Sequence, residues 1–197
     1  MKGTLVTGRP SLQVIAPAGH FHVNGAHLPR VLPESGVGHY LRDLVYGALD
    51  GGVTTLAIVA GASGADLGAR VAIILGLANL VGDGVSMAAG NYLGMRSEIQ
   101  QQGKDPDVAK PLRHGLATFA AFAVVGSVPL LSYLVPVGQP LWAAGVLTGA
   151  TLFVVGSLRA RFVPGQRAWK LGLEMVAIAA VAALAALGVG VAAGRLM

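Results

Sequence analysis

The chain has 197 residues, of which 54% are hydrophobic and only 12% charged, with a mean hydropathy of +0.66. Soluble domains usually carry about a quarter charged residues, so this composition excludes an ordinary soluble domain and predicts an all-α polytopic membrane protein. The absence of cysteine excludes disulfides and thiolate metal sites. The net charge is +5, but the charged residues stand between apolar segments, where they set the membrane topology rather than bind nucleic acid.

Residues 1–40 are predicted to form a cytoplasmic tail with little regular structure, ending in a short interfacial helix near residues 39–43. The tail contains four of the chain's five histidines. His20, His22 and His27 are close enough in sequence to suggest a metal site, because neutral imidazole suits Fe, Zn, Cu and Ni. No acidic residue or cysteine stands beside them, so loose histidines without a ligand remain the more common interpretation.

Five apolar segments follow, each long enough to cross a hydrocarbon core of about 30 Å. They cover residues 44–63, 68–95, 114–135, 140–158 and 171–194. We expect Pro129 to kink the third segment, because proline removes a backbone hydrogen bond. Residues 41–197 are therefore predicted to be a single domain of five transmembrane helices.

Lysine and arginine positions predict the orientation of these helices. Twelve such residues lie in the tail, in the connection between the second and third segments, and in the connection between the fourth and fifth. Only two, Arg70 and Arg195, lie on the opposite side. The positive-inside rule then places the N-terminus in the cytoplasm and the C-terminus outside.

The first segment contains acids at a depth where they are costly. Asp43, Asp50 and Thr54 share one helical face, and acids inside a membrane normally face a cavity, a partner or an ion. Gly47 and Gly51 form a small-xxx-small pair that permits close approach of another helix. The two glycines after Asp50 also suggest a local break that would free carbonyls for an ion. The alternative is that Asp50 only caps or pins a helix contact.

The second segment carries a stripe of polar residues inside an apolar run. Asn79, Asp83 and Met87 recur at every fourth residue, with Ser86 and Gly90 beside them, and we interpret this stripe as one side of a cation pathway. A hard oxygen and a soft sulfur one turn apart suit Fe²⁺ or Mn²⁺. The alternatives are core packing for Met87 and pairing with an interhelical donor for Asp83.

The last three segments are assigned to the scaffold, since the third and fourth have no ionisable residue in their middles. Glu174, near the cytoplasmic end of the fifth segment, is expected to pair with a neighbouring lysine or arginine. Trp142 and Trp169 lie close to segment ends, as is typical of interfacial anchors.

Four stretches carry a family resemblance. They are Leu41-Arg-Asp43-Leu-Val-Tyr46-Gly-Ala-Leu-Asp50-Gly51, Ala57-Ile-Val-Ala-Gly61, Gly76-Leu-Ala-Asn79 through Tyr92-Leu-Gly-Met-Arg96-Ser97-Glu98, and Lys110-Pro-Leu-Arg113 to Pro129-Leu-Leu. They resemble the vacuolar iron transporter family over roughly residues 40–195, with the most specific matches in the first two helices. The N-terminal tail lies outside the resemblance.

The resemblance implies a five-helix protomer that forms a homodimer, with a pathway between the subunits lined by their first two helices. Family members export cytosolic Fe²⁺, and often Mn²⁺, in exchange for protons. The resemblance carries Asp50 and Met87 over as pathway ligands. Asn79 stands where some members have a glutamate, and Asp83 is a candidate for supplying that acid.

The connection between the second and third helices departs from the family pattern. Many members have a long, Glu-rich insertion there that binds metal, whereas this chain has only a short loop. Glu98, Asp105 and Asp107 are either the remnant of an entrance site or solvated loop charges. The candidate metal ligands are thus Asp50, Met87, Asp83, Asn79, Asp43 and Glu98.

These inferences predict an integral, multi-pass exporter of divalent iron, in a plasma or inner membrane if bacterial and otherwise in an organelle membrane. No resident cofactor is expected; protons are the expected counter-ion. No nucleophile–base pair or closed metal cage is evident, so an enzyme is not expected. The alternatives are a manganese exporter and a non-transporting membrane anchor or sensor subunit, which the missing insertion favours.

Overall fold

The computed structural model describes residues 37–105, 110–134 and 138–196, which all belong to one compact unit comprising Leu32–Met197. His20, His22, His27 and Asp107 lie outside the described residues. The elements in chain order are η1 (Val37–Tyr40), α1 (Leu41–Gly64), α2 (Gly68–Gln101), α3 (Pro111–Leu134), α4 (Pro140–Arg159) and α5 (Ala168–Leu196).

Five of the described helices are long and apolar enough to cross a membrane, which confirms the predicted all-α class and the five spans. Each helix begins or ends within a few residues of its predicted bounds, except α2. With 34 residues, α2 is about 51 Å long at 1.5 Å per residue, whereas the hydrocarbon core is about 30 Å thick. Helix α2 is therefore longer than the apolar layer is thick, and its last turns carry the charged residues Arg96 and Glu98.

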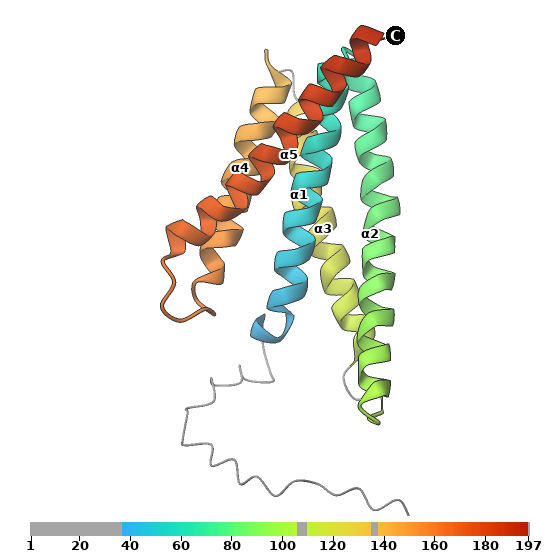
Figure 1. The fold of residues 1–197 in the computed structure, drawn as a ribbon, viewed down its shortest axis with the longest axis vertical. Coiled ribbons are helices and arrows are strands. Elements are labelled where there is room, and N and C mark those ends of the chain that lie inside the picture. Colours follow the sequence, from blue (N-terminus) through green and yellow to red (C-terminus); the bar gives the residue numbers. More distant parts are fainter. Residues whose placement is uncertain (1–36, 106–109, 135–137, 197) are drawn as a thin grey trace, which may run out of the picture. The chain divides into compact units, whose positions relative to one another are not determined.

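Helix α1 is the centre of the helix packing. It contacts α3 and α5 most extensively and also touches α2 and α4 (Figure 1). Helix α2 packs mainly against α3 and more lightly against α1. The remaining surface of α2 is not covered by the other described helices, and many of its apolar side chains, such as Val81 and Val85, are exposed. In a membrane this face meets lipid or another protein.

Glycines let α1 approach α3 closely. A Cβ atom on Gly47 would collide with the backbone carbonyl of Thr118, and one on Gly51 would collide with that of Phe122. The predicted small-xxx-small contact is therefore present. The predicted local break after Asp50 is wrong, because α1 is unbroken from Leu41 to Gly64. Gly47 and Gly51 thus provide backbone contact with α3, and the helix does not unwind after Asp50.

Helices α4 and α5 contain the scaffold features that the sequence predicts. The Arg159 guanidinium donates to the Glu174 carboxylate at 3.3 Å, which confirms the expected local ion pair. Trp142 and Trp169, near the first residues of α4 and α5, are both exposed, as interfacial anchors are. Pro129 lies inside α3 and is fully buried. The expected kink at this proline stays a prediction.

Candidate functional site

The polar stripe of α2 lies beside the face that packs on α3. That packed face consists of Ala72, Gly76, Leu80 and Gly84, all buried. Asn79, Asp83 and Met87 are each half-buried, as is expected for side chains at the margin of a helix contact. The stripe therefore reaches α1 without being enclosed by it.

In the middle of the membrane span, this stripe meets the acid-bearing face of α1. The Asn79 side-chain amide donates to the Thr54 hydroxyl at 3.3 Å, and that hydroxyl donates to the backbone carbonyl of Asp50 at 2.8 Å. Asp50 and Asp83 are close enough for their charges to interact. Two acids near each other at membrane depth require compensation by cations or protons, because isolated charges there are costly.

A groove with a volume of about 650 Å³ continues from this region toward the C-terminal end of α2. Its lining residues come from α1 and α2: Arg42, Asp43, Tyr46, Ser86, Met87, Gly90, Asn91, Gly94, Met95 and Glu98. Met87 lies in this lining and also packs against the hydrophobic core. Both interpretations of Met87, as a core residue and as a pathway residue, are therefore compatible with its position.

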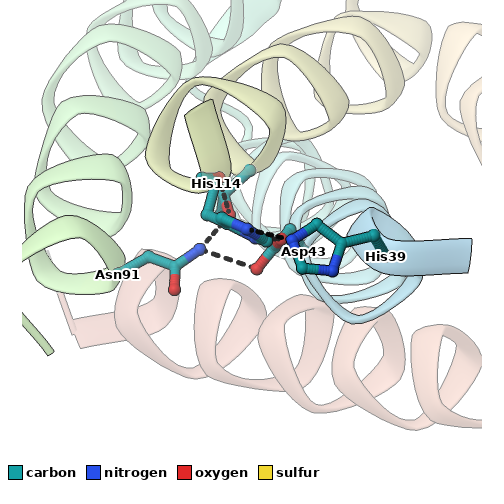
Figure 2. Close-up of polar contacts among 5 residues, drawn as sticks. His39, Asp43, Asn91 and His114 are labelled. Carbon is teal, nitrogen blue, oxygen red and sulfur yellow. Dashed lines mark hydrogen bonds and ion pairs between the residues drawn. The ribbon is translucent and has the colours of Figure 1, made fainter. Parts of the chain in front are cut away.

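One end of the groove is organised by a buried network of hydrogen bonds (Figure 2). Asp43 accepts from the Asn91 side-chain amide at 2.8 Å through Oδ1 and contacts Nδ1 of His114 at 2.5 Å through Oδ2. Asn91 also donates to the Thr118 hydroxyl at 2.7 Å. His114 Nε2 lies 3.0 Å from His39 Nε2. The network joins η1, α1, α2 and α3.

Two members of this network have roles that differ from the sequence-based expectation. His114 was not predicted as a site residue. The signal that could have identified it is its position, since it is the one histidine outside the tail and lies in the first turn of an apolar helix. Asn91, one turn beyond Met87 on α2, uses its amide nitrogen twice as a donor. Asp43, a predicted ligand, accepts hydrogen bonds through both of its oxygens. A metal bound to Asp43 would compete with these partners.

The six candidate ligands all lie on α1 or α2. Asp43, Met87 and Glu98 line the groove, and Asp50, Asn79 and Asp83 lie at the middle of the helices. In the described ranges, no group of three or more histidine or acidic side chains is arranged to hold a metal ion. The candidate ligands of one chain thus do not form a closed cage.

Comparison with known proteins yields one family. The family model described as the VIT family matches residues 41–105 and 95–191, which include all six candidate ligands on α1 and α2. The Vacuolar iron transporter 1 of Eucalyptus grandis is 22% identical over 213 aligned residues, covering 77% of this chain and 85% of that protein.

Two shorter alignments have higher sequence identities. A Vacuolar iron transporter of Toxoplasma gondii (strain ATCC 50861 / VEG) is 46% identical over 59 residues, 30% of this chain and 20% of that protein. A protein with the same name in Plasmodium berghei (strain Anka) is 35% identical over 60 residues, 30% of this chain and 22% of that protein. The chain thus spans only about a fifth of the length of these two relatives. Because the family model matches most of the chain, the chain belongs to the VIT family.

Proposed function

We propose that this protein exports Fe²⁺ from the cytosol by proton antiport, with Mn²⁺ as a second cargo, along a pathway at a homodimer interface. The observation that carries the proposal is the polar contact between α1 and α2, where Asn79 donates to Thr54, together with the groove that Asp43, Met87 and Glu98 line. Hard carboxylate oxygens together with a softer thioether favour a divalent transition metal over Mg²⁺ or Ca²⁺. The names of the relatives support iron as the cargo.

The exposed face of α2 supports the dimer. Small residues recur there at every fourth position: Ala78, Gly82, Ser86, Gly90 and Gly94. All five are exposed, and a Cβ atom on any of the three glycines would meet open space. Membrane helices pack through such small-residue stripes. A second α2 placed on this stripe would bring a second Asp83 and Met87 near the first pair.

The second chain also explains how an incomplete set of ligands can hold an ion. One protomer offers dispersed acids without a closed cage among its described residues. Two protomers would double the ligands around a shared axis, while no single chain would bind the ion so tightly that it could not leave. Glu98, at the exposed end of the groove, is suited to attract cations toward this axis.

Proton antiport follows from the chemistry of the same acids. Carboxylates must be deprotonated to bind a metal, so metal binding and proton binding compete at Asp50 and Asp83. After the ion leaves outward, protonation of these acids removes the charge repulsion between them. The protonated pair can then return to the cytoplasmic side at a lower electrostatic cost than the ionised pair.

Uptake of radioactive iron into proteoliposomes tests the proposal. We expect Asp50→Asn and Asp83→Asn each to reduce the initial rate of Fe²⁺ uptake by about tenfold or more, since each removes a charged ligand that has no local substitute. Glu174→Gln is the matched control, because it also removes one acid, but on α5 outside the stripe. It should keep the wild-type rate.

The outcomes separate the proposal from its rivals. Undiminished uptake in both aspartate variants would contradict the pathway. Uptake that ignores an imposed pH gradient would remove the antiport alone. Mn²⁺ competing better than Fe²⁺ for uptake would make manganese the main cargo. Metal binding without any uptake by the wild-type protein would favour a non-transporting sensor subunit.

A further inference from the structure

Two histidine side chains, His39 of η1 and His114 of α3, meet outside the set of candidate pathway ligands. His39 lies on η1 and is exposed, whereas His114 lies on α3 and is only 3% exposed. Their Nε2 atoms are 3.0 Å apart, while their ring centroids are 4.6 Å apart. Because the nitrogens are closer than the centroids, the two Nε2 atoms occupy the facing edges of the rings (Figure 2).

Asp43 fixes the chemical state of the inner imidazole. A carboxylate only accepts hydrogen bonds, so the proton shared at 2.5 Å with Asp43 belongs to Nδ1 of His114. In a neutral imidazole the other nitrogen then carries a lone pair. That lone pair, on Nε2, points toward His39. This carboxylate–histidine arrangement is the one that orients histidine ligands in metal proteins.

The spacing of the two nitrogens is close to that of two ligands of one ion. Two imidazole nitrogens bound to a tetrahedral ion at 2.0–2.1 Å are about 3.3 Å apart. The observed 3.0 Å would therefore have to widen by only about 0.3 Å. His39 is exposed, so it has room to make this adjustment and to move its own proton to Nδ1, where water can accept a hydrogen bond.

We propose that His39 and His114 form a binding site for a divalent transition metal, with Asp43 as the residue that positions His114. The ion replaces the hydrogen bond between the two Nε2 atoms, and both imidazoles remain neutral. Its positive charge is then offset by the Asp43 carboxylate behind His114. This site is additional to the proposed pathway and uses none of Asp50, Asp83 or Met87.

The donor set defines which ions fit. Imidazole nitrogen favours Zn²⁺, Co²⁺, Ni²⁺, Cu²⁺ and Fe²⁺, whereas Mg²⁺ and Ca²⁺ require oxygen ligands. Two protein ligands leave other coordination positions to water, so the ion can exchange. Asp43 also lines the groove, which puts this site at the same end of the protein as the exposed end of the proposed pathway.

Zn²⁺ titration of the full-length protein in detergent tests the site, with purification through an affinity tag that contains no histidine. We expect His39→Ala to abolish one binding event per chain, since it removes an exposed ligand without disturbing the core. Asp43→Asn should weaken Zn²⁺ binding about 10–100-fold, as loss of an orienting carboxylate does. Mg²⁺ should produce no corresponding binding event.

Two controls distinguish this site from the tail histidines and from the proposed pathway. A variant with His20, His22 and His27 all replaced by Ala should retain the binding event, and so should Asp50→Asn. Loss of binding in the triple variant, or unchanged binding in His39→Ala, would overturn the proposal. Thermal unfolding of each variant shows whether a loss reflects misfolding; His39→Ala should unfold at the wild-type temperature. Failure of iron transport would leave these Zn²⁺ results unchanged.

Discussion

At the scale of single residues, the network around Asp43 shows how this fold accommodates a buried acid. Asp43 is 4% exposed and His114 is 3% exposed, and both side chains have close polar partners. A buried carboxylate is costly unless hydrogen bonds compensate it, and Asp43 accepts one from Asn91 and one from His114. These hydrogen bonds therefore favour one arrangement of the junction between η1, α1, α2 and α3.

A single substitution can separate the two possible roles of Met87, packing in the core and binding of the metal ion. Met87→Leu conserves volume and should change the unfolding free energy by less than about 1.5 kcal/mol, because the contact with the core is kept. The thioether sulfur is lost, so we expect Fe²⁺ uptake into proteoliposomes to fall several-fold. Wild-type uptake in Met87→Leu would mean that Met87 serves only as packing.

At the scale of the helices, glycine spacing determines which pairs can pack closely. Gly47 and Gly51 of α1 lie against carbonyls of α3, and Gly190 of α5 lies against Gly61 of α1. Between membrane helices, van der Waals contact replaces the hydrophobic effect, so this close approach is a main source of cohesion. Helix α1 uses it on two sides, which is how one helix comes to contact all four of the other described transmembrane helices.

The Gly51→Ala variant tests this packing. Its Cβ atom would meet the backbone of Phe122, which cannot rotate away, so we expect a loss of about 1–3 kcal/mol in unfolding free energy. Gly188→Ala on α5 is the matched control, because its Cβ atom would meet nothing within 4 Å. The control should be neutral or up to about 1 kcal/mol more stable. Denaturant unfolding in mixed micelles measures both, and equal stabilities would refute close α1–α3 packing.

At the scale of the whole molecule, the uneven covering of the helices is the main feature. Helix α1 is covered by its neighbours, whereas the small-residue stripe of α2 faces outward, next to the candidate ligands. A stripe of this type is expected to be covered by a second copy of the chain in the membrane. The proposed dimer therefore predicts that α2 of one protomer lies against α2 of the other.

The absence of cysteine makes this arrangement directly testable. In Ser86→Cys, oxidation in the membrane should link two chains, because Ser86 lies near the middle of the exposed stripe and would face its own copy. Ala185→Cys is the control, exposed near the middle of α5 and outside the stripe. Gel electrophoresis without reductant measures the product. A cross-linked dimer from Ala185→Cys but not from Ser86→Cys would place the interface elsewhere.

The sequence by itself determined the membrane class, the five spans and the polar stripe of α2. These features depend on composition and on the repeat of side chains along one helix, which are local properties. The tertiary structure decided what the polar residues touch. Asp43 meets residues 48 and 71 positions away, Asn91 and His114, and no helical period relates such positions. The role of Gly51 was likewise decided by the neighbouring α3. A glycine permits either a break in the helix or close packing against another backbone, and the sequence of α1 alone does not select between them.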